Sequence, residues 1–187
     1  MAELKLSCHC GKVRGVAHDV SPSIGNRLIC YCESCQQFPI KLGKGGQVVD
    51  EYGGTDIYQL PPGQLKITEG VEEIRCLRHT SEGLYRFYAG CCDTPFANSP
   101  GPGMPFIGLL HVVDSQPEQR DAHIGGIRAH VNTVEATKPL PKDRKYGLAM
   151  VIVRIVSQMI WWRVTGRAKP HPFFTDDGLP IVEPEVR

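Results

Sequence analysis

Three cysteines lie within six residues, at Cys30, Cys32 and Cys35, in a chain that has eight cysteines among its 187 residues. A segment this short cannot join all three sulfurs in disulfides, but it can turn them toward one metal ion. Zn²⁺ bound by thiolates is the usual occupant of such a turn. Three ligands leave one tetrahedral position open for water, substrate or a distant residue, as in catalytic zinc sites. The spacing therefore predicts a zinc site at Cys30, Cys32 and Cys35, and what fills its fourth position decides whether the zinc is catalytic or structural.

Two further cysteine pairs lie near the ends of predicted hairpins. Cys8 and Cys10 form a C-x-C-G motif with Gly11, and Cys91 and Cys92 follow a strand pattern. Turns at hairpin ends are typical of small β zinc domains. The simplest partition is two metal sites, one closed by the two outer pairs and one open at the central cysteines. The alternative is a single zinc ion together with a few buried free thiols.

An open thiolate zinc site can act in two ways. It can hold a substrate thiol as a thiolate that attacks an aldehyde, or it can polarise a carbonyl or water as a Lewis acid. Three thiolates and Zn²⁺ give a net charge of −1, which weakens Lewis acidity and favours the thiol-presenting role. Among the histidines, we expect His9 to be exposed and His111 to be a core residue. His123 and His130 flank a Gly-Gly turn, and one of them is a candidate proton carrier.

Composition limits the kinds of partner. The formal net charge is +1, from 21 basic and 20 acidic residues, which argues against nucleic acid as the main ligand. The first residues contain no apolar signal region, and clustered cysteines that stay reduced favour metal binding, so we expect a cytoplasmic protein. Twenty glycines and fifteen prolines favour turns and short strands over a helical bundle.

Alternating apolar residues predict a mainly β fold of antiparallel hairpins. In an extended strand Cys76 and His79 point to opposite faces, so we expect Cys76 to be a small buried residue and not a ligand. The Gly- and Lys-rich segment 41–51 is expected to be a mobile loop, either one that cradles a phosphate or carboxylate or a solvated surface loop. The expected strands are 4–6 and 13–16, 26–29, 56–60, 65–67, 73–79 paired with 84–88, 106–113 and 129–132.

The tail changes character and predicts a C-terminal α-helix over residues 145–165. Apolar residues recur at helical spacing, and Gly166 with two following prolines ends the pattern. The length suits a membrane span, but Arg154 and Arg163 interrupt it. We expect the helix to pack on the sheet or at a homodimer contact; the alternative is peripheral membrane association through residues 146–165. The expected apolar stripe is Leu148, Ile152, Ile155, Met159 and Trp162, widened by Val151, Val156 and Ile160.

The chain is therefore divided into a zinc-binding β domain at residues 1–140 and a helix with a Pro-rich tail at residues 141–187 that packs on it. The tail beyond Lys169 is expected to be irregular.

The order of the three cysteine motifs resembles the family of glutathione-dependent formaldehyde-activating enzymes and centromere protein V. The matching segments are Cys8–Gly11 for C-x-C-G, Cys30–Cys35 for C-x-C-x-x-C, and Arg86–Pro95 for the aromatic-C-x-x-C-G-T-P motif. The resemblance covers roughly residues 4–115 and not the tail helix. It implies a zinc-binding β-tent, a structural zinc on the outer cysteines, and a catalytic zinc on the central three that binds glutathione or a small thiol adduct.

The third motif departs from the family pattern. Alignment on Thr94 and Pro95 places Cys92 at the last cysteine of the motif and Ala89 at the preceding one, while Asp93 replaces glycine. Cys91 is the candidate for the missing sulfur, although adjacent cysteines need a distorted backbone to reach one ion. The alternatives are a ligand from elsewhere in the chain or an empty outer site.

These features predict a zinc-dependent carbon–sulfur lyase-like protein that binds one or two Zn²⁺ ions and acts on glutathione or another small thiol or aldehyde adduct. The alternative is a non-catalytic, zinc-stabilised binding module whose tail helix makes protein or membrane contacts.

Overall fold

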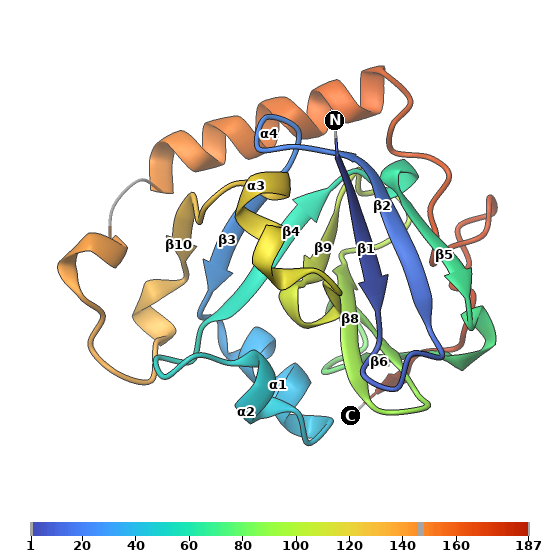
Figure 1. Cartoon of the computed structure of the whole chain (residues 1–187), viewed down its shortest axis with the longest axis horizontal. Coiled ribbons are helices and arrows are strands. Elements are labelled where there is room, and N and C mark those ends of the chain that lie inside the picture. Colours follow the sequence, from blue (N-terminus) through green and yellow to red (C-terminus); the bar gives the residue numbers. More distant parts are fainter. Residues whose placement is uncertain (1, 146–147, 187) are drawn as a thin grey trace.

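Two β-sheets form the body of the protein, whose computed structural model describes residues 2–145 and 148–186. Within these residues, the smaller sheet has three antiparallel strands in the order β1 (Ala2–Ser7), β2 (Arg14–Val20) and β5 (Leu65–Glu69). Strands β1 and β2 form the first hairpin of the chain, on the right of Figure 1.

The larger sheet runs through the centre of the molecule. In the described part of the chain it contains eight strands, β3 (Asn26–Cys30), β4 (Thr55–Leu60), β6 (Ile74–Arg78), β7 (Tyr85–Ala89), β8 (Thr94–Ser99), β9 (Ile107–Leu110), β10 (Ala129–Val131) and β11 (Glu185–Val186). Their order is β10-β3-β4-β9-β8-β7-β6-β11. Neighbouring strands are antiparallel except at the two edges, where β10 runs parallel to β3 and β11 runs parallel to β6.

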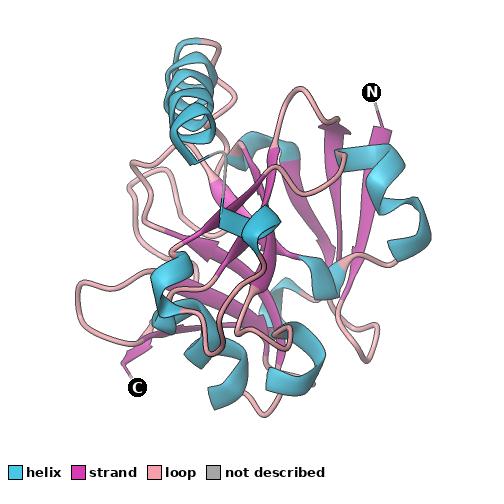
Figure 2. Cartoon of the chain, turned by 90° about the vertical axis from the view of Figure 1, so that its left-hand side faces the viewer, coloured by secondary structure: helices cyan, strands magenta, loops and turns pink. Residues whose placement is uncertain are grey.

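Helices lie at the periphery of the sheets. The described ranges contain four α-helices, α1 (Glu33–Lys41), α2 (Gly45–Val48), α3 (Arg120–Ile124) and α4 (Leu148–Val164). They also contain short 3-10 turns at Pro62–Gln64, Val71–Glu73, His111–Val113, Pro117–Gln119, Thr133–Glu135 and Lys142–Lys145. Helix α4 lies at the top of Figure 1 and α1 and α2 at the bottom, and Figure 2 shows α4 on the outside of the molecule.

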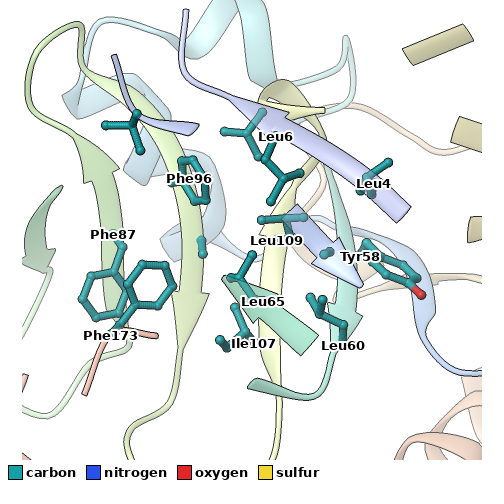
Figure 3. Packing of buried hydrophobic residues seen from close by; sticks show 14 of the residues in the cluster. Leu4, Leu6, Tyr58, Leu60, Leu65, Phe87, Phe96, Ile107, Leu109 and Phe173 are labelled. Carbon is teal, nitrogen blue, oxygen red and sulfur yellow. The ribbon is translucent and has the colours of Figure 1, made fainter. Parts of the chain in front are cut away.

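The main core joins the two sheets. Leu4, Leu6 and Leu65 of the smaller sheet belong to one buried cluster with Phe96 and Leu109 of the larger sheet (Figure 3). Apolar residues alternate along β1, so that one face of the strand is buried and the other is exposed. The alternation that predicts the first hairpin therefore also determines which face of it packs on the larger sheet.

The predicted mainly β fold with antiparallel sheets and a C-terminal helix is confirmed. The segment 41–51 differs from the predicted mobile loop, because it contains the last residue of α1 and the short helix α2. The predicted strand at 106–113 ends at Leu110, after which the chain forms a 3-10 turn. Strand β8 has no alternation to signal it, because all six of its residues are buried.

The tail beyond Lys169 is irregular for most of its length, as predicted, but it is anchored in the core. Phe173 and Phe174 are buried, and the Phe173 ring stacks on Phe87 with centroids 4.1 Å apart. The last residues add β11 to the edge of the larger sheet. The tail is therefore part of the fold and not an appendage.

The predicted helix is present as α4, although residues 146–147 of the prediction lie outside the described part of the chain. Only part of the predicted apolar stripe lies on the buried face of α4. Trp162 and Val151 are buried, but the widening residues Val156 and Ile160 are exposed, as is Ile152.

Two polar residues explain the difference, because they occupy the inner side of α4. The Arg154 guanidinium donates to the carbonyl oxygens of Pro22 and Ser23, and the Gln158 amide donates to those of Ser23 and Ile24. Hydrogen bonds as well as apolar contacts therefore attach α4 to the loop before β3, and they rotate the helix so that much of its apolar surface faces outward.

Candidate metal centres

Four cysteine sulfurs from two distant turns meet at one end of the first hairpin. Cys8 and Cys10 lie in the β1–β2 turn, and Cys91 and Cys92 lie between β7 and β8. The four sulfurs all lie within 4.8 Å of one another, with Cys8–Cys10, Cys8–Cys91 and Cys10–Cys91 at 3.6, 3.8 and 3.2 Å. Tetrahedral zinc with bonds of about 2.3 Å to sulfur requires sulfurs about 3.8 Å apart. The outer group therefore fits a closed four-sulfur site.

The adjacent pair Cys91 and Cys92 can both reach this group because the chain reverses directly after it. Their sulfurs are 3.9 Å apart, and Asp93 has a φ of +53°. Aspartate tolerates this left-handed conformation better than most residues, so the turn forms with Asp93 where the resembled motif has glycine. Thr94 ties the two turns together: its hydroxyl accepts the N–H of His9 and lies 3.0 Å from the Cys92 sulfur.

The outer sulfurs differ in acidity. Burial raises the pKa of Cys8 and of Cys91. Burial also opposes ionisation of Cys92, but hydrogen bonds from the Thr94 hydroxyl and from Cys10 lower the pKa of Cys92 to about 6. One thiolate is therefore available near neutral pH to take the first bond to a metal ion.

The central group is built where a strand passes into a helix. Cys30 ends β3, Cys32 is the N-cap of α1, and Cys35 lies in the first turn of that helix. Their sulfurs all lie within 4.8 Å of one another, with Cys30 and Cys32 at 3.4 Å. The backbone N–H of Cys32 favours negative charge on the Cys30 sulfur, and the backbone N–H of Cys35 favours it on the Cys32 sulfur. The start of α1, and not an isolated loop, therefore brings the three sulfurs together.

A proline within α1 is accommodated beside this group. Pro39 has no N–H to donate to the carbonyl of Cys35 four residues earlier. The Thr55 hydroxyl of β4 lies 3.4 Å from that carbonyl oxygen and donates to it instead. Strand β4 thus supports the helical turn that holds Cys35.

The central cysteines share negative charge unevenly. Hydrogen bonding with the Cys32 thiol, and then with Cys35, lowers the pKa of Cys30 to about 3 and outweighs the desolvation of Cys30. The Asn132 amide contributes by donating a hydrogen bond of 3.4 Å to the Cys30 sulfur. The same coupling to Cys30 raises the pKa of Cys35 and of Cys32.

A buried arginine lies behind the central group. Arg86 of β7 is 0% exposed, and its guanidinium donates to Asn98 Oδ1 at 2.9 Å and to Ser34 Oγ at 2.6 Å. The Cys35 sulfur is 3.9 Å from the same Nη2 atom. Among the described residues no carboxylate lies within 4 Å of this guanidinium. A buried cation needs a counter-charge, and the cysteine group is the one within reach.

The central sulfurs open into a cavity of about 270 Å³. Next to the sulfurs its walls are Leu28, Ile57, Val131 and Asn132. Its other walls are Gln59, Leu84, Asn98, Pro100, Phe106 and Ile155, the last from helix α4, with Gly108. All three central cysteines line this cavity, so a small molecule in it would contact the sulfurs directly.

The histidines take no part in either group of cysteines. His9 is exposed, as predicted, and the partly buried ring of His111 lies 3.4 Å from the carbonyl of Asp56. His130 is hydrogen-bonded to the Tyr31 hydroxyl at 3.0 Å, and neither it nor His123 lines the cavity. The positions of His123 and His130 do not support the predicted role of either one as a proton carrier at the site.

Sequence reasoning overlooks the two polar residues that contact the central sulfurs. Arg86 has a visible signal, because it is a cation among the apolar and aromatic residues of the predicted strand 84–88. Asn132 follows β10 and has a left-handed φ of +55°, a conformation that asparagine favours. The predicted isolation of Cys76 is confirmed: it is buried in the core and joins neither group.

Fold and cysteine geometry together define a mainly β protein with two cysteine groups that could hold metal ions. The chain belongs to DUF6151, described as a family of unknown function, whose sequence model matches residues 2–185. A search of curated proteins finds no match. Among solved structures, it is similar to a Rhodobacter sphaeroides protein determined as a structural genomics target, at 14% identity and a TM-score of 0.46. That similarity covers 66% of this chain and 97% of the other.

Proposed function

We propose that this protein is a zinc-dependent carbon–sulfur lyase-like enzyme that acts on a small thiol or aldehyde adduct at Cys30, Cys32 and Cys35. The observation that carries the proposal is the contrast between the two groups of cysteines. The outer group has four sulfurs, whereas among the described residues no fourth ligand joins the central group, which opens into a cavity. Three protein ligands with an open position are the arrangement of catalytic zinc sites.

The chemistry follows from the charges around the open position. Zn²⁺ bound there would lower the pKa of a substrate thiol and favour its thiolate form. Addition to an aldehyde forms a bond between the thiol sulfur and the carbonyl carbon while the thiol proton passes to the carbonyl oxygen, and the lyase direction reverses both changes. Arg86 offsets the negative charge of the sulfurs, and the Asn132 amide positions Cys30 by donating a hydrogen bond to its sulfur. Most of the cavity wall is apolar, so a bound substrate would displace water from the reacting atoms.

The resemblance of the three cysteine motifs to the glutathione-dependent formaldehyde-activating family supports the same chemistry. That family uses the order of motifs found at Cys8–Gly11, Cys30–Cys35 and Arg86–Pro95. Glutathione is the substrate thiol that the resemblance implies. The departure at Ala89 does not leave the outer group short of sulfur, because Cys91 completes it.

Metal analysis of matched cysteine variants tests the proposal. We expect Cys32→Ala to reduce the bound zinc by one ion per chain and Cys76→Ala, which removes a buried thiol outside both groups, to leave it unchanged. In the zinc-loaded protein a small thiol should raise the melting temperature, and Cys32→Ala should abolish that rise. A zinc content unaffected by Cys32→Ala would refute the open zinc site.

The outer face of helix α4 supports a second function, contact with an anionic membrane surface. This face exposes Met150, Ile152, Val153, Val156, Ile160, Trp161 and Val164. The segment Lys142–Val164 is also long and apolar enough to cross a membrane by length and composition. Because Arg154 and Gln158 hold the inner side of α4 to the loop before β3, we propose that the helix lies on the surface and does not span the bilayer.

The distribution of charge along the chain indicates which kind of surface the outer face of α4 would bind. Residues 144–175 contain six lysines and arginines and no acidic residue, which leaves 15 basic and 20 acidic residues in the rest of the chain. Arg154 lies on the inner side of α4 and Arg144 pairs with Asp50, but Arg163 and Lys169 near the end of the helix are exposed. Exposed cations beside an apolar helix complement anionic headgroups, at about 1 kcal/mol for each cation near the surface. An acidic body with one apolar helix face and exposed cations at one end of it would approach such a membrane in one orientation.

Vesicle sedimentation of the full chain tests this second function. We expect binding to phosphatidylcholine vesicles that contain phosphatidylserine, little binding to phosphatidylcholine alone, and loss of binding in Val153→Asp. The control is Val134→Asp, which changes another exposed valine away from α4. Equal binding of both variants, or a stable dimer in light scattering that Val153→Asp dissociates, would refute the membrane assignment.

A further inference from the structure

The cavity beside the central cysteines has walls of unusual chemistry for a site that binds glutathione. Seven of the lining side chains are aliphatic, aromatic or proline, and three are the neutral amides of Gln59, Asn98 and Asn132. Among the described residues that line it there is no lysine, arginine, histidine, aspartate or glutamate. A ligand in this cavity therefore meets the three sulfurs, three amides and otherwise apolar surface.

The nearest cation is already engaged. The Arg86 guanidinium is fully buried and does not line the cavity, and its Nη atoms donate to Asn98 and Ser34 behind the Cys35 sulfur. It faces the Cys35 sulfur and, because it is fully buried, it is not exposed to a substrate carboxylate in the cavity. Glutathione at neutral pH carries two carboxylates and an ammonium group, and burial of unpaired charges costs several kcal/mol each.

We infer that the substrate of the central site is an uncharged thiol or thiol adduct with an apolar body, and not glutathione. This inference rests on the proposed thiol chemistry and specifies its substrate class. Amide groups near the sulfurs can hydrogen-bond a hydroxyl or carbonyl oxygen of such an adduct, while the apolar walls hold its carbon skeleton.

Helix α4 has a direct part in this selection. Ile155, at the middle of the helix, is one of the cavity walls, while Ile152, one turn earlier, is half exposed on the outer side. Lysine substitutions at these two isoleucines form a test and its control. A charge at residue 155 would lie at the cavity, whereas the same charge at residue 152 would lie in solvent. The tail helix, which the motif resemblance does not cover, thus supplies a specificity-determining residue.

The test uses protein loaded with Co²⁺ in place of zinc, because the absorption of cobalt bound by thiolates responds to an added sulfur ligand. The probes are 3-mercaptopropionate and its methyl ester, which share one skeleton and differ in charge, together with glutathione and benzyl mercaptan. We expect the ester and benzyl mercaptan to change the spectrum at concentrations about tenfold or more below those of the acid and glutathione. Ile155→Lys should weaken ester binding by about tenfold or more, and Ile152→Lys should not change it.

Each outcome separates this inference from the function on which it rests. Binding of the acid or glutathione as tight as that of the ester would overturn the substrate class and keep the thiol chemistry. An absence of spectral change with every thiol would overturn the proposed function itself. The ratio of ester to acid binding in the unaltered protein decides the question even if Ile155→Lys does not fold.

Discussion

The buried cation beside the central sulfurs yields a quantitative prediction. The guanidinium of Arg86 lies 3.9 Å from the Cys35 sulfur and has no carboxylate within 4 Å among the described residues. With zinc bound at the central cysteines Cys35 would be a thiolate, and two unit charges at this distance attract by about 4 kcal/mol at an effective dielectric constant of about 20. If the cysteine group is the counter-charge of Arg86, removal of either partner alone should destabilise the fold by about 3–5 kcal/mol.

A double-mutant cycle isolates this interaction. We expect Arg86→Met and Cys35→Ser to be strongly destabilising alone and markedly less than additive together. Because Cys30 and Cys32 keep part of the negative charge, the expected coupling energy is about 2–4 kcal/mol. Urea unfolding at a fixed excess of Zn²⁺, followed by intrinsic fluorescence, gives the four free energies of unfolding. Cys35→Ser weakens metal binding in both the single and the double variant, so most of that loss cancels from the coupling energy.

The control cycle pairs Arg86→Met with Cys76→Ser. Cys76 is also a buried thiol, on the strand next to Arg86, but it lies outside both cysteine groups. Its coupling to the guanidinium should be within about 0.5 kcal/mol of zero. A coupling of that small size between Arg86 and Cys35 would show that the cysteine group is not the counter-charge, and the anionic character assigned to the site would be wrong.

Three further predictions concern stability. Trp162→Ala should cost about 3–5 kcal/mol because its side chain is 1% exposed, whereas Trp161→Ala, on the exposed side of α4, should cost under about 1 kcal/mol in urea unfolding. Burial lowers the pKa of His171 to about 4, so the unfolded chain takes up this proton first and stability should fall by about 2–3 kcal/mol as the pH drops from about 6.5 to 4. His171→Leu should remove that part of the acid dependence in pH-dependent unfolding, and an unchanged slope would contradict the assignment. Asp93→Val should destabilise the turn after Cys92 by about 1–2 kcal/mol because valine tolerates a φ of +53° poorly, and Asp93→Gly should show no such loss in the same unfolding assay.

The sequence predicts the cysteine groups better than the residues that support them. Cysteine spacing is a local property, so the hairpin turn at Cys8 and Cys10 and the cluster beginning at Cys30 are visible in the printed chain. Arg86 and Asn132 reach the sulfurs only through the arrangement of strands, and they are separated from their partners by 51 and 102 residues. No short-range pattern encodes such contacts.

The position of helix α1 and the orientation of helix α4 are hard to predict from the sequence for a related reason. Helix α1 contains Pro39, and the Cys35 carbonyl that proline cannot bond accepts the Thr55 hydroxyl from another strand. Helix α4 has a clear apolar period, but its orientation depends on hydrogen bonds from Arg154 and Gln158 to a loop more than 100 residues earlier. Periodicity predicts that a helix forms, and tertiary hydrogen bonds decide which face it buries.

The two cysteine groups differ in what a metal ion would contribute to the fold. The outer group joins Cys10, in the β1–β2 turn of the smaller sheet, to Cys91, in the β7–β8 turn of the larger one, 81 residues away. A metal ion there would close a long loop and hold the sheets together. The central group connects β3 only to the helix that directly follows it, so the same ion would close almost no loop. It also lies beside the buried Arg86, whose desolvation is a cost that a purely structural site could avoid. Stability alone gives little reason to bear that cost at the central cysteines, which favours the proposed chemistry at this group and a structural role for the outer one.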